Sequence, residues 1–563
     1  MSNNILAKLL AQAAARKLEL AAKAKPAFTV SPIESYISQE IASLYKDEEK
    51  GITYNAKQSE FISLLRKGQS CVLVGAAGTG KTTCMKGALQ ALISSGLVSP
   101  YENDGHKHLK NATHGILICA YTRRAVANIK KNLSHDMRGS CVTVHAALEY
   151  APEYYEIIDP ITHEPRNTMK FIPTRNKNRP LADSIKYCVI EESSMLGVDL
   201  FNELKDALHP ACKFILLGDI QQLPPVFGAA ILGFKMLEYP VVELTEVYRQ
   251  ALESPIISLA HRILSGTAMN LAEMNTWTEQ NAEKGLSFHP IKKKLAPEHI
   301  TPRIASFLKG QLQSGLFNPE TDTVLIPFNK GLGTLEMNKE LAQYLTVKRN
   351  ALTYEIIAGF NKIYYAPGDK VLYEKEDAEI ISINKNGAYA SFKMPKHESL
   401  TLDRWGYDTA SGKLLENELG EDDFALDNID LVLDNMRASP EEDKERKQES
   451  SHVITIRMMA DGEEISLSKA AELNSLLLGY CLTVHKSQGS EWSKVYCIFH
   501  QSHNTMIARE LLYTAITRAR EECYIICEPD TFEKGITRQK VPGDTIEAKA
   551  IYFQGKVERG EGA

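Results

Sequence analysis

The sequence has no C-x-x-C pair among its ten cysteines, no apolar run of the roughly 18 residues that span a bilayer, and no secretory leader with a cleavage site. Scattered cysteines argue against a zinc ribbon and favour a reducing compartment, so we expect a cytoplasmic protein without a membrane partner. A basic surplus is also missing, because 65 Lys and Arg stand against 71 Asp and Glu. This excludes a protein coated with basic charge, but not one that holds nucleic acid in a localised groove.

What the chain does have is a glycine-rich loop between a predicted strand and a predicted helix. An apolar run from residue 71 leads into G-x-x-x-x-G-K-T, and helix-forming residues follow. In such a loop, successive backbone N–H groups and the helix dipole face phosphate oxygens. We predict an ATP site in which Lys81 reaches the β- and γ-phosphates and the Thr82 hydroxyl binds Mg²⁺. The residues expected to contact the nucleotide here are Gly75, Ala76, Ala77, Gly78, Thr79, Gly80, Lys81, Thr82 and Thr83.

A pair of carboxylates ends another predicted strand, residues 186–190. With a phosphate site in place, Glu191 would hold Mg²⁺ through its water shell and Glu192 would orient the attacking water. The alternative is a cluster of acids at a helix N-terminus, where negative charge is also favoured.

Three further polar residues are candidates for the same site. Gln222 follows a predicted strand and could contact the γ-phosphate or its water, and Arg249 follows a short strand further on. Gln58, in a predicted helix ahead of the loop, could read the adenine edge because its amide both donates and accepts. A glutamine on an exposed helix face, however, needs no such role.

Two more predicted strands, from residues 115 and 141, end in hydroxyl and basic residues. Open α/β sheets bind ligands at the carboxyl ends of their strands, and such side chains suit the phosphates of a nucleic-acid strand. Thr122, Arg123, Thr143 and His145 are therefore candidate nucleic-acid contacts, although each position is also typical of a plain strand-to-helix junction. Residues 146–183 then mix tyrosines, prolines and basic residues, which is either a single-strand-binding insertion or a decorated surface loop.

The order of these motifs, followed by T-V-H-K-S-Q-G at residues 483–489 and Y-T-A-I-T-R-A at residues 513–519, resembles the superfamily 1 helicases. The proline pair Pro224 and Pro225 resembles the pair that the RecD/Dda-like branch has in its third motif. The layout of the motifs is closest to that of the phage Dda-type members of this branch. The resemblance spans roughly residues 51–530. One departure concerns the acidic pair, where Glu191 stands in place of the family's aspartate.

The resemblance implies roles for residues that the pattern alone leaves open. Arg518, supplied across a cleft, and Arg249 would stabilise charge on the transferring phosphoryl group, with Gln488 and Gly489 towards the same cleft. The further implied nucleic-acid contacts are Pro224, Pro225, Asn329, Thr483, His485 and Lys486.

The resemblance also implies an α/β fold of two tandem RecA-like P-loop NTPase lobes, with an inserted β-hairpin subdomain and an inserted SH3-like small β-barrel. The expected domains are an N-terminal helical extension 1–50; a first lobe 51–145 and 184–265 with the ATP site; an inserted wedge 146–183; a second lobe 266–365 and 473–540; a β subdomain 366–472 with an acidic excursion at 416–449; and a C-terminal tail 541–563.

The function this implies is ATP-dependent unwinding of DNA in replication, recombination or repair, with 5′ to 3′ movement on single strands, in a prokaryotic or phage-infected cytoplasm. The partners would be single-stranded DNA and its junctions with duplex. The N-terminal helix or the acidic run could bind a replication or single-strand-binding protein, and the chain would be a monomer. The alternative is an ATP-switched factor that displaces proteins or anneals strands without processive unwinding. A P-loop kinase of a small molecule is disfavoured by the second lobe.

Overall fold

A computed structural model of the protein describes residues 46–47, 52–158, 165–224, 230–246, 253–291, 295–358, 361–373, 376–386, 449–459, 462–543 and 545–559. By its contacts the chain divides into residues 1–60 and residues 61–563. The first unit contributes the short antiparallel pair β1 (Lys46–Asp47) and β2 (Ile52–Thr53), and the start of α3 (Ala56–Arg66). All remaining elements belong to the second unit.

The first large sheet is six-stranded and parallel, in the order β10-β3-β9-β8-β4-β5. Its central strands are continuous apolar runs, as expected for strands covered on both faces. Their bounds are β3 Cys71–Gly75, β4 Ile116–Ala120, β5 Cys141–Thr143, β8 Tyr187–Ile190, β9 Lys213–Gly218 and β10 Val241–Leu244. The predicted strand through His145 ends earlier, because the Thr143 hydroxyl accepts the Ala146 N–H and begins a helix.

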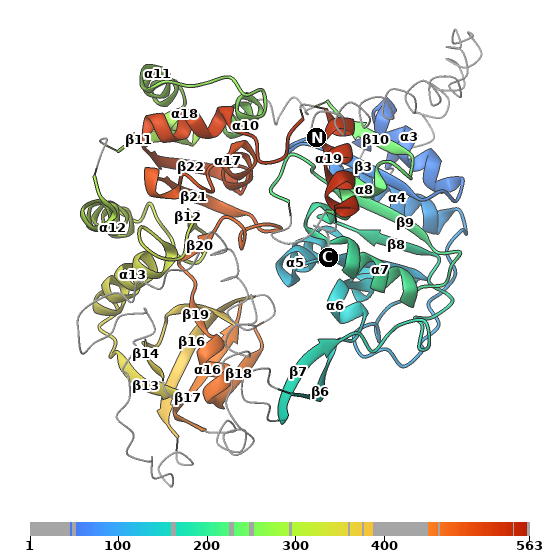
Figure 1. Ribbon diagram of the computed structural model, residues 1–563, viewed down its shortest axis with the longest axis horizontal. Coiled ribbons are helices and arrows are strands. Elements are labelled where there is room, and N and C mark those ends of the chain that lie inside the picture. Colours follow the sequence, from blue (N-terminus) through green and yellow to red (C-terminus); the bar gives the residue numbers. More distant parts are fainter. Residues whose placement is uncertain are drawn as a thin grey trace. The chain divides into compact units, whose positions relative to one another are not determined.

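The second large sheet is five-stranded and also parallel, in the order β11-β22-β21-β12-β20 (Figure 1). Its strands are β11 Leu286–Pro290, β12 Thr323–Ile326, β20 Cys481–Thr483, β21 Trp492–Phe499 and β22 Ala519–Cys527. Two separate parallel sheets in one chain confirm the predicted α/β class. They fit two tandem RecA-like lobes.

Helices flank these strands along the described chain. Their bounds are α4 Lys81–Ser94, α5 Arg123–Asn132, α6 Val144–Ala147, α7 Val198–Ala207, α8 Ile231–Lys235, α10 Pro255–Leu264, α11 Leu271–Asn281, α12 Pro297–Gln313, α13 Thr334–Lys348, α16 Ala470–Ser475, α17 Arg509–Ile516, α18 Pro529–Thr537 and α19 Ile546–Glu558. Short 3₁₀ turns are η1 His135–Ser140, η2 Ser193–Met195, η3 Ala282–Lys284 and η6 Gln501–His503. Among the residues that the structure describes, no helix has the length and apolar character needed to cross a membrane.

A third sheet is antiparallel, in the order β18-β17-β16-β15-β19. Its strands are β15 Lys370–Tyr373, β16 Glu376–Lys385, β17 Glu449–Met458, β18 Glu464–Lys469 and β19 Leu477–Leu478. It shares one apolar core with the antiparallel pair β13 (Tyr354–Ala358) and β14 (Asn361–Tyr365), which begins ahead of the predicted boundary at residue 366. That this subdomain is an SH3-like barrel stays a prediction.

The insertion after β5 contains the antiparallel pair β6 (Ala151–Ile158) and β7 (Pro165–Ile172). Its base is fixed by Arg175, which is buried and donates to Glu149 at 2.7 Å and to Asp104 at 2.6 Å. Tyr150 also donates to Glu203. Arg175, one of the basic residues in the predicted insertion 146–183, therefore adds no basic surface for nucleic acid, because its guanidinium is buried and paired with the buried Glu149 and with Asp104.

Two other features differ from the predicted organisation. Helix α10 packs its apolar face into the core of the second sheet, although its residues fall within the predicted first lobe. Helix α19, in the stretch expected to be a plain tail, packs against α8 and adds Ala550 and Phe553 to the core of the first sheet (Figure 1). The N-terminal extension up to residue 45 and the acidic run 416–448 lie outside the described residues, as do Pro225 and Arg249.

Candidate functional site

The glycine-rich loop after β3 has the conformation that binds phosphate. Gly78 and Gly80 have φ angles of 79° and 82°, in the left-handed region that favours glycine. A Cβ at Gly75 would overlap the buried Thr79 hydroxyl, which donates to Ala76 O at 2.8 Å. Helix α4 begins at Lys81 with its first N–H groups directed towards the loop. The arrangement is a nest of donors at a helix N-terminus, which attracts anions.

Lys81 lies over this loop. Its Nζ donates to Gly75 O at 2.6 Å and to Ala76 O at 3.1 Å. The ammonium group is thus held where phosphate oxygens of a bound nucleotide would meet it. The lysine and the loop form one positively polarised cradle.

The two carboxylates lie where β8 ends. The Thr82 hydroxyl donates to Glu191 Oε1 at 3.3 Å, which joins the loop to the acidic pair. Burial, and next to it the charge of Glu192, raise the pKa of the Glu191 carboxyl to about 7. Glu192 has a φ angle of 51°, uncommon for a residue with a Cβ.

Glu192 also bears on the alternative interpretation of the acidic pair. It occupies the N-cap position of η2, but its side chain makes no capping hydrogen bond within the described structure. Helix capping therefore does not explain the pair. Backbone strain at a polar residue that lines a pocket is typical of a functional position.

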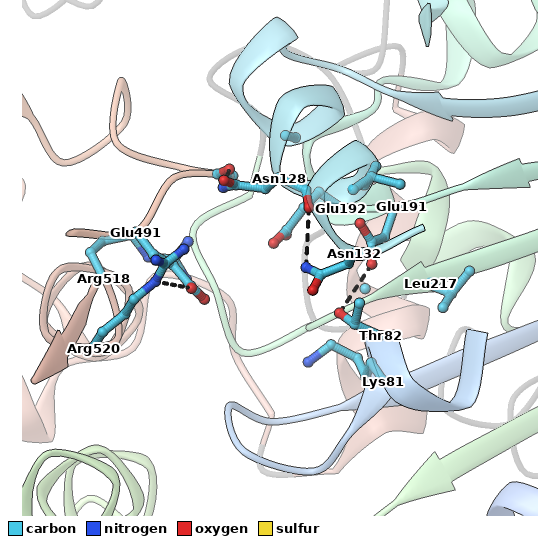
Figure 2. A pocket seen from close by; sticks show the side chains of 14 residues that line it. Lys81, Thr82, Asn128, Asn132, Glu191, Glu192, Leu217, Glu491, Arg518 and Arg520 are labelled. Atoms are coloured by element: carbon cyan, nitrogen blue, oxygen red, sulfur yellow. Dashed lines mark hydrogen bonds and ion pairs between the residues drawn. The ribbon is translucent and has the colours of Figure 1, made fainter. Parts of the chain in front are cut away.

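These groups share a pocket with residues from the second sheet (Figure 2). Arg518, Arg520 and Glu491 line one side of it, and Lys81, Thr82, Glu191 and Glu192 line the other. Sequence reasoning missed Asn128, Asn132, Glu491 and Arg520. The last two stand within two residues of recognised motifs, which was the available signal.

Arg518 is buried, and its guanidinium is oriented by its own surroundings. It donates to Thr514 O at 3.0 Å, to Ser490 O at 3.2 Å and to the Thr517 hydroxyl at 3.3 Å. Arg520 beside it pairs with Glu491 at 3.0 Å. The arginine is therefore presented to the pocket in a fixed direction.

The loop after β9 carries Gln222 but does not bring it to the pocket wall. The side chain is buried, and its Oε1 has no hydrogen-bond partner among the residues described. Around it, Tyr513 donates to Asp219 Oδ2 at 2.5 Å and accepts the Ala77 N–H at 2.8 Å. This tyrosine, also missed from the sequence, joins α17 both to the phosphate loop and to the β9 loop.

The H-K-S-Q-G motif contacts the β9 loop and the N-terminal part of α5. Gln488 donates to Leu223 O at 2.8 Å, so its amide is engaged with backbone. Gly489 lines the pocket with a φ of 73°, and a Cβ there would approach the Thr122 hydroxyl to 3.1 Å. Asn128 donates to Gly489 O at 3.0 Å. Gln58, in the first unit, is buried and accepts the Asn55 N–H at 3.1 Å, which caps α3.

The predicted nucleic-acid residues form two groups. Thr122 and Thr143 cap α5 and α6, with Arg123 exposed beside the first, and His145 lies edge-on between two tyrosines. Asn329, Thr483 and Lys486 line a second, mostly apolar pocket that also includes Tyr364 and Asn338. His485 and Pro224 are half-buried and do not belong to that lining. The structure thus brings together three of the second-sheet candidates.

The chain is similar in sequence to two protein families and to known helicases. Residues 58–228 match the AAA domain family and residues 478–526 match the UvrD-like helicase C-terminal domain. The ATP-dependent RecD2 DNA helicase of Deinococcus radiodurans is 26% identical over 501 residues, which cover 89% of this chain and 52% of that one. The ATP-dependent DNA helicase dda of Enterobacteria phage T4 is 30% identical over 197 residues, 34% of this chain and 37% of that one.

The chain thus spans about half the length of the first of these relatives. A crystal structure of the Pif1 helicase from Candida albicans is similar with a TM-score of 0.44 and 13% identity, covering 90% of this chain and 100% of that chain. That likeness supports no statement about activity.

Proposed function

The chain belongs to the RecD/Dda-like branch of the superfamily 1 helicases, and from this premise we propose that it uses ATP to move 5′ to 3′ along single-stranded DNA and to unwind duplexes. The observation that carries the proposal is the pocket in which a phosphate loop beside one sheet faces an arginine beside the other. A site divided in this way responds to movement of the two parts, which couples hydrolysis to motion. Replication, recombination or repair would be its setting.

In this proposal ATP is the substrate, and the chain's own side chains divide the work. Lys81 would bind the β- and γ-phosphates, and Arg518 would stabilise the charge that develops on the transferring group. Glu192, held in its unusual backbone conformation, would orient the attacking water. Arg249, outside the described residues, and Gln222 are proposed to complete the γ-phosphate contacts.

The residues present also fit a Mg²⁺ ion. The Thr82 hydroxyl and a Glu191 carboxylate oxygen lie 3.3 Å apart, and both are the oxygen ligands that Mg²⁺ takes. The ion would neutralise charge on the phosphate oxygens. Glu191 is one methylene longer than the family's aspartate, and its contact with Thr82 supports its reach to the metal position.

We propose that single-stranded DNA lies along the carboxyl ends of both parallel sheets. Thr122, Thr143 and His145 at the first sheet, and Thr483 and Lys486 at the second, would contact its backbone alternately as ATP is hydrolysed. Hydroxyl and basic groups at these ends suit sequence-independent phosphate contacts.

The β6–β7 pair is the proposed wedge that separates the duplex. Its strands pair from Ala151 with Ile172 to Ile158 with Pro165, which makes an extended two-stranded element. The buried ion pair between Arg175 and Glu149 anchors it at its base. A rigid support of this kind would let the element resist load without bending.

The deciding experiment compares unwinding of forks that carry only a 5′ tail or only a 3′ tail, with Lys81→Ala as the inactive control. We expect ATP-dependent strand separation from the 5′ tail and ATP hydrolysis that rises when single-stranded DNA is added. Separation from the 3′ tail alone would overturn the polarity. Hydrolysis stimulated by DNA with the duplex left intact would support an ATP-switched remodelling factor instead.

A further inference from the structure

A fully buried lysine in the C-terminal helix lies between the β9 loop and α17. Lys549 of α19 is 1% exposed. Its Nζ donates to Gln221 Oε1 at 2.6 Å and lies 4.0 Å from Glu510 Oε1. Burying an ammonium group is costly unless it is paired and hydrogen-bonded, so a specific arrangement must hold it.

Glu510, the acidic partner, is equally buried and belongs to α17, the helix that leads to Arg518. Its carboxylate also accepts the Lys540 N–H at 2.9 Å and the Val541 N–H at 3.1 Å. These N–H groups belong to the stretch between α18 and α19. The Glu510 carboxylate therefore contacts both the segment that precedes α19, through Lys540 and Val541, and α19 itself, through Lys549.

The rest of α19 packs on the core of the first sheet. Ala550 and Phe553 are buried there, and a Cβ at Gly233 of α8 would overlap the Phe553 ring. Such close approach leaves the helix little freedom to shift. Figure 1 shows α19 beside α8. The stretch from Lys540 to α19 thus runs from the α17 side to the first sheet, and Lys549 lies at its centre.

Gln221, which Lys549 contacts, immediately precedes Gln222 in the β9 loop. The same loop is held by Tyr513 at Asp219 and by the Thr514 hydroxyl, which accepts the Leu223 N–H at 3.0 Å. Unlike Tyr513 and Thr514, Lys549 lies outside the sequence motifs. It also lies outside the two segments that match known families, which end at residues 228 and 526.

We propose that Lys549 is a positioning residue of the ATP site, which fixes the β9 loop through Gln221 against Glu510 and so sets the place of Gln222. The proposal rests on the proposed ATPase. Lys549 does not line the pocket, so it would act through the loop. A loop displaced by about 1 Å can lower turnover by about 10²-fold while substrate binding is kept.

The test uses the full chain and measures kcat and KM for ATP with single-stranded DNA at saturation. Lys549→Met keeps the length and apolar stem but removes the ammonium group, and we expect kcat to fall about 10- to 100-fold with KM changed less than about 3-fold. Lys556→Met, two turns further along α19 where the ammonium lies 5.8 Å from the Tyr552 ring, is the matched control and should keep wild-type kcat.

Two further variants separate positioning from simple destabilisation. Gln221→Met removes the contact from the loop side, and we expect the same fall in kcat; combining it with Lys549→Met should add little, because both act through one contact. Lys549→Arg should recover part of kcat. If Lys549→Met and Gln221→Met both turn over like Lys556→Met, or if their effects multiply, the proposal is wrong; Gln221→Met alone decides if Lys549→Met does not fold. Wild-type protein without ATPase would instead overturn the proposed function.

Discussion

Replacing Glu191 by glutamine should stabilise the protein at alkaline pH although it damages the proposed ATP site. The carboxylate is desolvated and lies beside Glu192, and the pKa of Glu191 is raised from 4.5 to about 7. Because the folded protein binds this proton more tightly than the unfolded chain, the ionised form is disfavoured in the fold. The stability that the proton contributes is therefore lost as pH rises from about 4.5 through about 7.

The size of the effect follows from the pKa. One pKa unit corresponds to about 1.4 kcal/mol, so ionising Glu191 costs the folded protein up to about 3 kcal/mol at pH 8.5 and about 1 kcal/mol at pH 5. Glutamine removes that cost without removing much volume. A domain of 150–250 residues gains about 2–4 °C per kcal/mol, so we expect the melting temperature of Glu191→Gln to exceed that of wild type by several degrees at pH 8.5 and by little at pH 5.

The assay is thermal melting of both proteins across this pH range without nucleotide. Glu340→Gln is the control for the loss of one negative charge. Glu340 of α13 pairs with Lys309 of α12 at 2.6 Å, so its replacement should not raise the melting temperature. Adding Mg²⁺ and a non-hydrolysable ATP analogue should narrow the difference, because the cation compensates the wild-type carboxylate. A pH-independent difference, or a Glu191→Gln protein less stable than wild type at pH 8.5, would refute the reasoning.

Three other predictions follow from the contacts. Tyr513→Phe removes the donor to Oδ2 of the buried Asp219 carboxylate, whose Oδ1 still accepts the Gln221 N–H, and should cost about 1.5–3 kcal/mol in thermal or denaturant unfolding, with Asp219→Asn adding much less in the Tyr513→Phe background. Arg518→Ala should lower kcat for ATP by about 10³-fold or more with nucleotide affinity, measured by fluorescent-analogue titration, largely kept. Arg124→Ala and Asp377→Ala, which break one ion pair between α5 and β16, should have non-additive effects on the melting temperature; additive effects would show that the pair is not coupled.

The parts of the site that could be predicted are those with a local signal. The phosphate loop and the acidic pair each follow directly from a short apolar run that becomes a strand, so spacing alone locates them. Tyr513 and Lys549 could not be found this way, because their partners Asp219 and Gln221 lie 294 and 328 residues away. Arg175 was misjudged because its partners Glu149 and Asp104, 26 and 71 residues away, are not part of a local pattern.

Helix α19 shows why the remainder of the fold was not predictable. Its apolar face is short, and the feature that accommodates it is Gly233, a glycine in a different helix that leaves room for the Phe553 ring. Nothing within residues 541–563 encodes that room. A sequence pattern identifies what a segment would bury, but not the surface that receives it.

The contacts between the β9 loop, the phosphate loop and the second-sheet elements have a strength suited to a switch. Tyr513 with Asp219, Tyr513 with Ala77, and Leu223 with Thr514 and Gln488 are four hydrogen bonds, and one of them involves a carboxylate. At about 1 kcal/mol for each neutral bond and about 1.5–3 for the charged one, they total about 5 kcal/mol. A ligand must supply about 5.5 kcal/mol of differential affinity to reverse a two-state equilibrium from 1:99 to 99:1. For the proposed motor, the bonds are thus strong enough to hold the parts together and weak enough for binding of nucleotide and DNA to separate them. Contacts from Lys549 and Glu510 add to this total, so we expect loss of α19 to favour separation of the β9 loop from α17.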